Sequence, residues 1–279
     1  MELVERVIPQ ESIILRPVSD LQVGAPGCDL ERFKRWFDEG LQLGAYFYGV
    51  GDYVDDASPS GRKKIRNADF YDSTVNDLEE SAMRRYEEVR DLFKQAGDHW
   101  LFLLGGHHYY QFEDGRMTDI MLAEALGCPF LGTSTVFQLN LQRQAHSAQH
   151  CQVFAHHGER AFKRPDLGLA YIERDIAPAW PTVDIFTIAH SHLAATQKVE
   201  LMVPKYGKHP AIKGKQRLYS LSGAWMKGYV VGNQRGGRPS GTYVEQQLLR
   251  PNSIGGVTIR VESVHTGNFD YLEISGTTD

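Results

Sequence analysis

Short apolar runs, each followed by a polar loop, recur along the chain and predict buried strands. Five of these strands organise the first two thirds of the sequence, at residues 12–18, 44–50, 99–104, 151–155 and 183–189. Apolar residues at helical spacing predict three helices between them, at residues 29–43, 75–95 and 118–126. Asp29 is the expected N-cap of the first helix, and Gly97 follows the end of the second.

The pattern of the last third of the chain predicts strands without helices, at residues 217–221, 243–249, 257–265 and 271–275. Residues 1–11 are expected to form an N-terminal tail, 55–67 a surface loop and 205–240 a basic, loop-rich insertion. The length of 279 residues suits one α/β domain spanning 1–279. Alternating strands and helices that give way to strands predict a layered architecture.

Composition narrows the class of protein. Hydrophobic residues make up 42% and charged residues 23% of the chain, which is typical of a globular protein. No apolar stretch approaches the roughly 18 residues of a membrane span, and the first dozen residues lack signal-peptide features. Cys28, Cys128 and Cys151 are too few and too far apart for a disulfide framework. A cytoplasmic location is therefore predicted.

The net charge of −5 hides an uneven distribution. Between Lys205 and Ser240 there is no acidic residue, and residues 61–66 add the basic run GRKKIR. The basic residues of the longer segment are Lys205, Lys208, Lys213, Lys215, Arg217, Lys227, Arg235 and Arg238. Such a surface can attract phosphate-bearing ligands, although a solvated loop face explains it equally well.

Each of the five early strands is followed by a loop that carries Asp or His. These residues are Asp20, Asp52, His107 with His108, His156 with His157, and His190 with His192. Ligand sites of open α/β sheets form at the carboxyl ends of strands, so these loops are expected to converge. A lone Asp or His at a strand end is usually structural, but six of the eleven histidines fall in these three pairs. Carboxylate and imidazole together suit Zn, Mn or Fe, which predicts a di-metal site.

These loops resemble the ordered signature of the calcineurin-like metallophosphoesterases, which is D-x-H, G-D-x-x-D, G-N-H, a later His beside Gly or a second His, and G-H-x-H. The corresponding segments are DLQ at 20–22, GDYVD at 51–55, GHH at 106–108, HHG at 156–158 and AHSH at 189–192. The resemblance covers about residues 13–192. It implies a calcineurin-like four-layer αββα sandwich, with two mixed β-sheets flanked by helices and a metal site at the C-terminal ends of strands.

The resemblance also implies roles for the matching residues. Asp52 would bridge two divalent ions, Mn, Fe or Zn. One site would be completed by Asp20, Gln22 and His192, and the other by His107, His190 and either His156 or His157. His108 would be a general acid or electrostatic stabiliser oriented by Asp55.

Three residues depart from the family pattern: Gln22 replaces a His ligand, His107 replaces Asn, and Ala189 replaces Gly. An amide oxygen is a weaker ligand than imidazole, so the metal position beside Gln22 is expected to be weak, selective for Mn or empty. In an alternative register, Gly105-Gly106-His107 would align with G-N-H and leave no ligand at Gly106. The register that uses both histidines is preferred.

The implied function is hydrolysis of a phosphodiester or phosphomonoester by metal-activated hydroxide, with a small phosphate ester, a nucleotide or a nucleic acid as substrate. Aromatic residues near the motifs could stack on bases or simply pack the loops; they are Tyr53, Tyr109, Tyr110 and Trp225. The alternatives are a degenerate metallophosphoesterase-fold module for binding or scaffolding, and an amidohydrolase-type metallohydrolase. The amidohydrolase interpretation lacks the usual H-x-H on a first strand. Retention of His108, Asp55, His190 and His192 argues against a scaffold. The chain also has no phosphate-binding P-loop.

Overall fold

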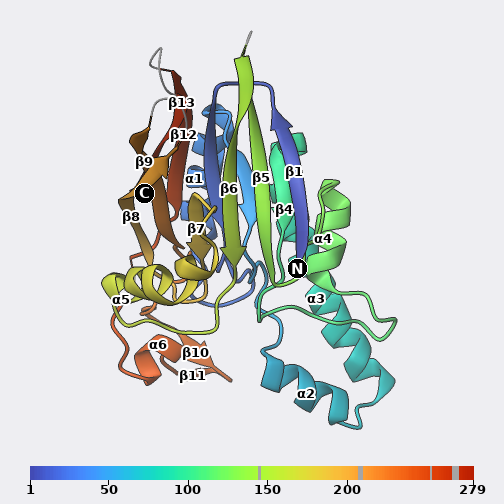
Figure 1. Cartoon of the computed structure of the whole chain (residues 1–279). Coiled ribbons are helices and arrows are strands. Elements are labelled where there is room, and N and C mark those ends of the chain that lie inside the picture. The colour runs from blue at the N-terminus through green and yellow to red at the C-terminus, as the bar shows by residue number, and fades with distance from the viewer. Residues whose placement is uncertain (144–145, 207–209, 252, 266–269) are drawn as a thin grey trace.

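Two mixed β-sheets face each other in the computed structural model, which describes residues 1–279 except 144–145, 207–209, 252 and 266–269 (Figure 1). The six-stranded sheet has the order β1 (Glu2–Ile8), β5 (Ser134–Arg143), β6 (His146–His156), β7 (Ile185–Ile188), β9 (Ala211–Ser222) and β8 (Ala194–Lys205). The five-stranded sheet has the order β13 (Asp270–Thr278), β12 (Val257–His265), β2 (Ser12–Val18), β3 (Tyr46–Gly49) and β4 (Trp100–Leu103). A small hairpin pairs β10 (Gln234–Arg235) with β11 (Arg238–Pro239).

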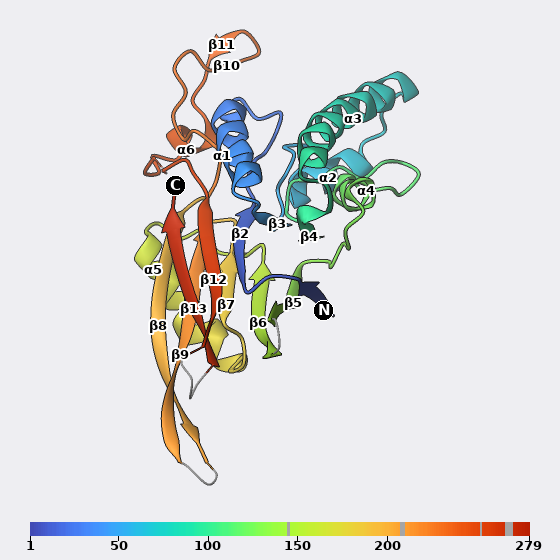
Figure 2. The same ribbon diagram turned by 90° about the horizontal axis from the view of Figure 1, so that it is seen from above.

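Helices flank both sheets (Figure 2). On the side of the five-stranded sheet lie α1 (Leu30–Gln42), α3 (Asp72–Phe93) and α4 (Thr118–Leu126). A 3₁₀ segment, Lys94–His99, extends α3. On the six-stranded sheet lies α5 (Pro165–Tyr171), followed by a π segment at Ile172–Ile176 and a 3₁₀ turn at Ala177–Ala179. Two more helices, α2 (Pro59–Asn67) and α6 (Tyr243–Gln246), lie at the end of the molecule that is lowest in Figure 1.

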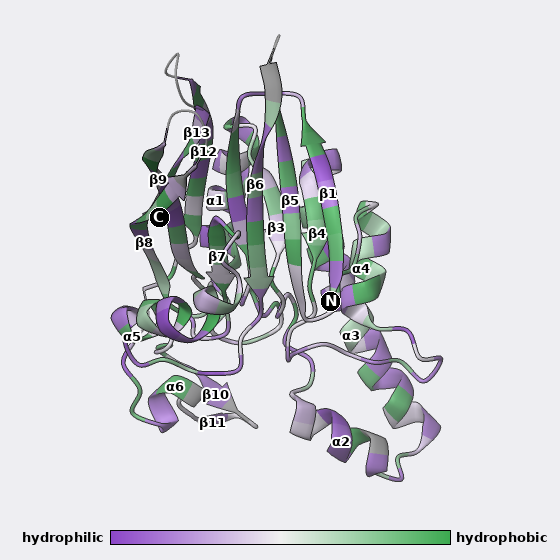
Figure 3. Cartoon of the chain, viewed as in Figure 1, coloured by the Kyte–Doolittle hydropathy of each residue, from purple (hydrophilic) through white to green (hydrophobic). Residues whose placement is uncertain are grey.

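The largest apolar core fills the space between the two sheets. Leu15 and Phe102 from one sheet pack in the same cluster as Phe137 and Val153 from the other. Figure 3 shows hydrophobic and hydrophilic residues alternating in bands along the strands, whereas α2 is largely hydrophilic. This division follows from alternating side chains, which turn one face of each strand toward the opposite sheet.

An aromatic layer holds α1 and α3 against the five-stranded sheet. Phe37 of α1 lies 4.6 Å from Phe47 of β3, and Phe93 of α3 lies 4.6 Å from Trp100 of β4, measured between ring centroids. Asp29 caps α1 by accepting a hydrogen bond from the Arg32 backbone N–H at 3.3 Å, as predicted. The apolar spacing that predicted these helices is therefore the spacing that buries them.

Several elements differ from the sequence expectation. Residues 1–11 are not a tail, because β1 pairs in parallel with β5 along its whole length. The expected loop at 55–67 contains the helix α2. Ser58 caps the start of this helix, because its hydroxyl oxygen accepts a hydrogen bond from the Gly61 backbone N–H at 3.2 Å. The strand expected at 243–249 is wrong, since α6 occupies its first half. The segment 205–240 contains the strand β9, which pairs with β8.

Two features of the described chain bear on its class. The three cysteines are free, which agrees with the absence of a disulfide framework in the sequence. Within the described ranges, every helix is too short or too polar to cross a lipid bilayer.

Candidate metal centre

Five parallel-running strands deliver their following loops to one end of the molecule. In the five-stranded sheet β2, β3 and β4 run parallel, and in the six-stranded sheet β6 and β7 do so. The loops after them meet where the arrowheads of these strands point, toward the lower end in Figure 1. The convergence expected from the sequence is present, because the side chains of four of these loops come together in one cluster.

The cluster consists of Asp52, His107, His157 and His190, whose ligand atoms all lie within 4.8 Å of one another. These residues could hold a metal ion. Burial is the main cause that lowers the pKa of His107, and it lowers the pKa of His190 to about 4. Repulsion from the neighbouring His157 is the second cause for both residues. Both imidazoles are therefore neutral at physiological pH and offer a lone pair to a cation.

Asp52 is fixed by the loop that follows β4. Its Oδ1 accepts hydrogen bonds from the backbone N–H groups of His107 and His108, the latter at 2.8 Å. Its Oδ2 lies 3.2 Å from Nε2 of His157, yet neither of these two buried atoms has a hydrogen-bond partner of good geometry in the described structure. Burial alone would raise the pKa of Asp52, but the contact with His157 holds it well below its usual range. Two buried ligand atoms that lie 3.2 Å apart without a well-formed hydrogen bond suit a shared cation.

The structure separates the two histidines that follow β6. His157 is 2% exposed, and its Nδ1 lies 2.7 Å from the Val50 carbonyl oxygen, which fixes the proton there and leaves Nε2 facing Asp52. The Nδ1 of His156 instead accepts the Gly158 backbone N–H at 2.6 Å. His157 therefore lies in the cluster, and His156 stabilises the turn beside it. The burial of His157 opposes protonation, but Asp52 raises its pKa to about 9 in the metal-free protein.

Asp20 forms a second group with His192. Asp20 is fully buried, and its Oδ1 lies 3.3 Å from Nε2 of His192 without a hydrogen-bond partner of good geometry among the described residues. Its Oδ2 accepts the His190 backbone N–H at 3.1 Å, which links this group to the first. Gln22 is also buried, and its backbone N–H donates to the Asp52 carbonyl oxygen at 3.0 Å.

The backbone at the centre is strained. Six non-glycine residues of the described chain have positive φ, and five of them are candidate ligands: Asp20 (48°), Gln22 (49°), Asp52 (58°), His190 (66°) and His192 (54°). Each left-handed residue costs on the order of 1–2 kcal/mol, so such residues persist where the surroundings impose them. The concentration of strain at these five positions marks a site whose geometry is held against local preference.

Two glycines make this geometry feasible. A Cβ on Gly106 would lie 2.1 Å from Asp52 Oδ1, and a Cβ on Gly51 would lie 2.6 Å from the Cα of Gly106. Gly51 also has a φ of +95°. Only glycine lets these two loops approach closely enough for backbone N–H groups to reach the Asp52 carboxylate.

His108 and Asp55 form a pair beside the cluster. Their side chains are 29% and 33% exposed, and Nδ1 of His108 lies 3.0 Å from Oδ1 of Asp55. The hydrogen bond with Asp55 raises the pKa of His108, although burial opposes this. A protonated imidazole at a partly open position is suited to donating a proton to a bound ligand.

Sequence reasoning missed two residues that support the centre. Arg62 of α2 donates to the carbonyl oxygens of His107 at 2.7 Å and Tyr109 at 3.2 Å, and its guanidinium lies 3.6 Å from the Tyr109 ring centroid. Asp119 of α4 is buried, and its Oδ2 accepts the Gly106 N–H at 3.2 Å. Burial raises the pKa of Asp119 to about 7. The Ser58-Pro59 pair, a good helix start, was the available signal for α2 and hence for Arg62.

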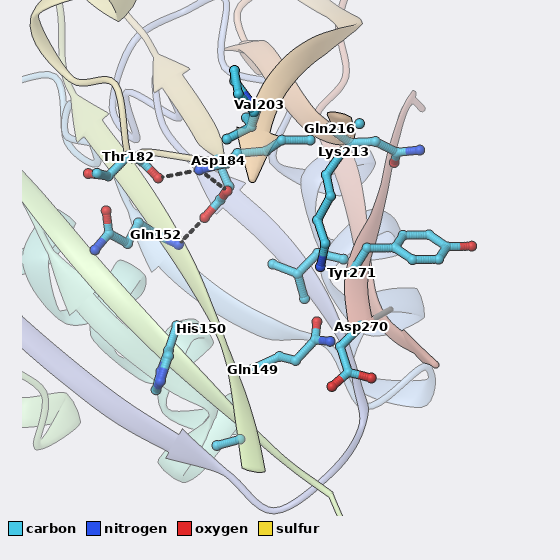
Figure 4. A pocket seen from close by; sticks show the side chains of 15 residues that line it. Gln149, His150, Gln152, Thr182, Asp184, Val203, Lys213, Gln216, Asp270 and Tyr271 are labelled. Carbon is cyan, nitrogen blue, oxygen red and sulfur yellow. Dashed lines mark hydrogen bonds and ion pairs between the residues drawn. The ribbon is translucent and has the colours of Figure 1, made fainter. Parts of the chain in front are cut away.

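The basic segment at 205–240 does not form one surface. Lys215 pairs with Asp184 at 2.9 Å, and Arg217 donates to the Val183 carbonyl oxygen at 3.0 Å, both near the start of β7. A cavity of about 650 Å³ lies there, lined by Asp184, Lys215 and residues of β6 and β13 (Figure 4). It is at the opposite end of these strands from the centre. Lys208 lies outside the described residues.

Comparison with known proteins does not assign this chain to a family. No protein-family model and no curated protein sequence matches the chain. Among solved structures, the Vacuolar Protein Sorting 29 structure from Cryptosporidium parvum is 8% identical, with a TM-score of 0.37, over 97% of this chain and 100% of that one. A likeness this weak assigns neither a family nor a function, and both are inferred from the residues of the centre.

Proposed function

We propose that the chain is a metal-dependent phosphoesterase, a variant of the calcineurin-like metallophosphoesterases, acting on a phosphodiester or phosphomonoester. The observation that carries the proposal is the set of buried ligand atoms that lack a hydrogen bond of good geometry, Asp20 Oδ1, Asp52 Oδ2 and His157 Nε2, at the ends of parallel strands. The apolar clusters between the two sheets and between each sheet and its helices support the family's four-layer αββα arrangement.

The donor set fits divalent transition metals. Carboxylate and neutral imidazole are ligands for Mn, Fe and Zn, and the group of Asp52, His107, His157 and His190 offers four of them. Asp20, His192 and Gln22 would hold a second ion, with Asp52 between the two. That second position has one imidazole fewer than the family pattern, and we expect it to bind metal more weakly.

When bound, such ions lower the pKa of water and neutralise phosphoryl oxygens. The chain's own groups would supply the remaining steps. His108, held by Asp55 through Nδ1, would carry a proton on Nε2 and donate it to the leaving oxygen of the ester. Asp52 accepts hydrogen bonds from two backbone N–H groups, so its carboxylate would keep its position relative to the other ligands during the reaction.

The rival proposal is a binding or scaffolding module with the same fold, favoured by Gln22 in place of a ligand histidine. The His108–Asp55 pair argues against it, because a scaffold has no need for a partly exposed histidine whose pKa is raised by a carboxylate.

The test is metal analysis of protein purified without chelator, followed by hydrolysis of bis-p-nitrophenyl phosphate with added Mn²⁺. We expect bound metal, turnover, and loss of turnover in Asp52→Asn. A matched control is Asp184→Asn, which alters a buried aspartate at the opposite end of the strands. A chain that binds no metal and hydrolyses no ester would leave the scaffolding module as the better interpretation.

A further inference from the structure

Two projections stand at the end of the molecule that carries the candidate centre. The first, the α2 arm, comprises residues 57–67, and the second, the β10–β11 arm, comprises residues 226–250. Figure 1 shows them on the right and left of the lower end, and Figure 2 shows them apart as well. We propose that these two arms bind a single-stranded polynucleotide and lead it across the centre, an inference that rests on the proposed phosphoesterase function.

Each arm is attached to a different side of the centre. Arg62 joins the α2 arm to the His107 carbonyl oxygen. The base of the β10–β11 arm is joined by the Trp225 N–H, which donates to the Asp20 carbonyl oxygen at 3.1 Å, and by the ion pair of Lys227 with Asp29 at 2.9 Å. A chain lying across both arms therefore passes over the ligand loops that lie between them.

The β10–β11 arm has internal bonds that give it a fixed shape. Tyr229 donates through its hydroxyl to the Leu249 carbonyl oxygen at 2.9 Å, and the Ser240 N–H donates to the Asn233 carbonyl oxygen at 2.9 Å. The Thr242 hydroxyl donates to the Gly228 carbonyl oxygen. These bonds close the segment on itself, so its surface is presented as a unit.

Both arms are basic on a chain of net charge −5. The α2 arm contains Arg62, Lys63, Lys64 and Arg66 and no acidic residue. The β10–β11 arm contains Lys227, Arg235, Arg238 and Arg250 against the single acid Glu245. Of the described side chains, Lys63, Lys64, Arg238 and Arg250 are exposed, as is Lys227, which pairs with Asp29. Cations concentrated at one end of an acidic protein steer a polyanion to that end.

The position of these cations favours a polymer over a mononucleotide. Arg62 is engaged by the centre's own loop, whereas Lys63 and Lys64, which follow it in α2, are exposed. A single phosphate seated at the cluster leaves these lysines without a partner. A strand with several phosphates reaches the cluster and the lysines together.

Exposed aromatic rings favour a single strand. Tyr229 on the β10–β11 arm is 45% exposed, and Tyr71, four residues beyond the α2 arm, is 85% exposed. Unpaired bases stack on such rings, whereas the bases of a duplex are already stacked and covered by the backbone. Cations that follow phosphates, together with aromatics that take bases, are the combination used to bind single strands.

The test measures binding without catalysis. Fluorescence anisotropy of labelled 16-nucleotide DNA and RNA, in EDTA, gives the affinity and its dependence on salt. We expect Lys63→Ala/Lys64→Ala to weaken binding and to reduce the slope of log K against log salt by roughly 1.4, since each phosphate contact on a single strand contributes about 0.7. Tyr71→Ala, which removes a ring that is 85% exposed, should weaken binding about 5-fold or more with the slope unchanged.

The matched control is Lys94→Ala/Lys198→Ala, two exposed lysines outside the arms, which should leave affinity and slope at wild-type values. The inference is overturned if the arm variants bind like this control, if a nucleoside monophosphate at equal phosphate concentration displaces the oligonucleotide, or if duplex binds more tightly than single strand. Turnover of bis-p-nitrophenyl phosphate by the wild type distinguishes failure of the binding proposal from failure of the phosphoesterase proposal. Turnover without arm-dependent binding refutes the arms alone, and absence of turnover refutes the phosphoesterase.

Discussion

Replacing Gly106 by alanine should disable metal binding while the two sheets stay folded. The added Cβ would lie 2.1 Å from Asp52 Oδ1, about 1.3 Å short of an ordinary 3.4 Å contact. The Asp52 backbone nitrogen lies at 2.2 Å, so the side chain cannot escape by rotating alone. Metal–ligand distances tolerate only about 0.2 Å, so a displacement of this size is expected to cost roughly 100-fold in affinity.

The substitution should also destabilise the metal-free protein. Forcing a methyl group into a filled site typically costs about 1–3 kcal/mol, and misplacing the charged acceptor of two backbone N–H groups adds to this. Calorimetric titration with Mn²⁺ gives the affinity, and urea unfolding in EDTA gives the stability.

Gly105→Ala is the matched control, one residue away in the same loop. Its Cβ would meet the edge of the Phe130 ring at 3.3 Å, a contact that a small shift relieves, and neither glycine has a positive φ. We expect Gly105→Ala to bind Mn²⁺ within threefold of the wild type. Equal Mn²⁺ affinity of the two variants would refute the view that close approach at Gly106 builds the centre.

The proton-donor role proposed for His108 predicts that His108→Ala lowers kcat by about 10²-fold or more for phenyl phosphate esters, and less for p-nitrophenyl esters, whose leaving group needs no proton. Because Asp55 raises the pKa of His108, Asp55→Asn should move the alkaline limb of the pH–rate profile to lower pH. The pKa of Asp119 rises from 3.8 to about 7 on folding, so wild-type stability in EDTA should fall as pH rises through this range. At pH 8, the free energy of unfolding of Asp119→Asn should therefore exceed that of the wild type by up to ~4 kcal/mol, and at pH 4 the two proteins should be equally stable. Urea titrations at the two pH values measure this difference. Tyr48→Phe removes the buried hydroxyl pair with Thr187, 2.8 Å apart between the sheets, and should cost about 1–2 kcal/mol without altering Mn²⁺ affinity.

The strands that carry the centre were predictable because they are short, apolar and bounded by polar loops. Residues 12–18 match β2, and 118–126 match α4, whose end at Gly127 adopts the left-handed cap that its sequence favours. The edge strand β8 was not predicted, because exposure on one side gives it polar residues that hide its alternation. An edge position alone does not decide which strands are found, because the edge strands β4 and β13 were predicted whereas the interior strand β5 was not.

The choice between His156 and His157 shows why a ligand set cannot be completed from sequence. The two residues are adjacent, have the same chemistry and follow the same strand. They are distinguished by a carbonyl 107 residues away in sequence, that of Val50, which orients one ring, and by a local N–H that occupies the other. The contact between Gly106 and Asp52 is equally non-local. Composition and spacing therefore predict which loops converge, whereas the packing of two sheets decides which atom of each loop faces the candidate metal centre.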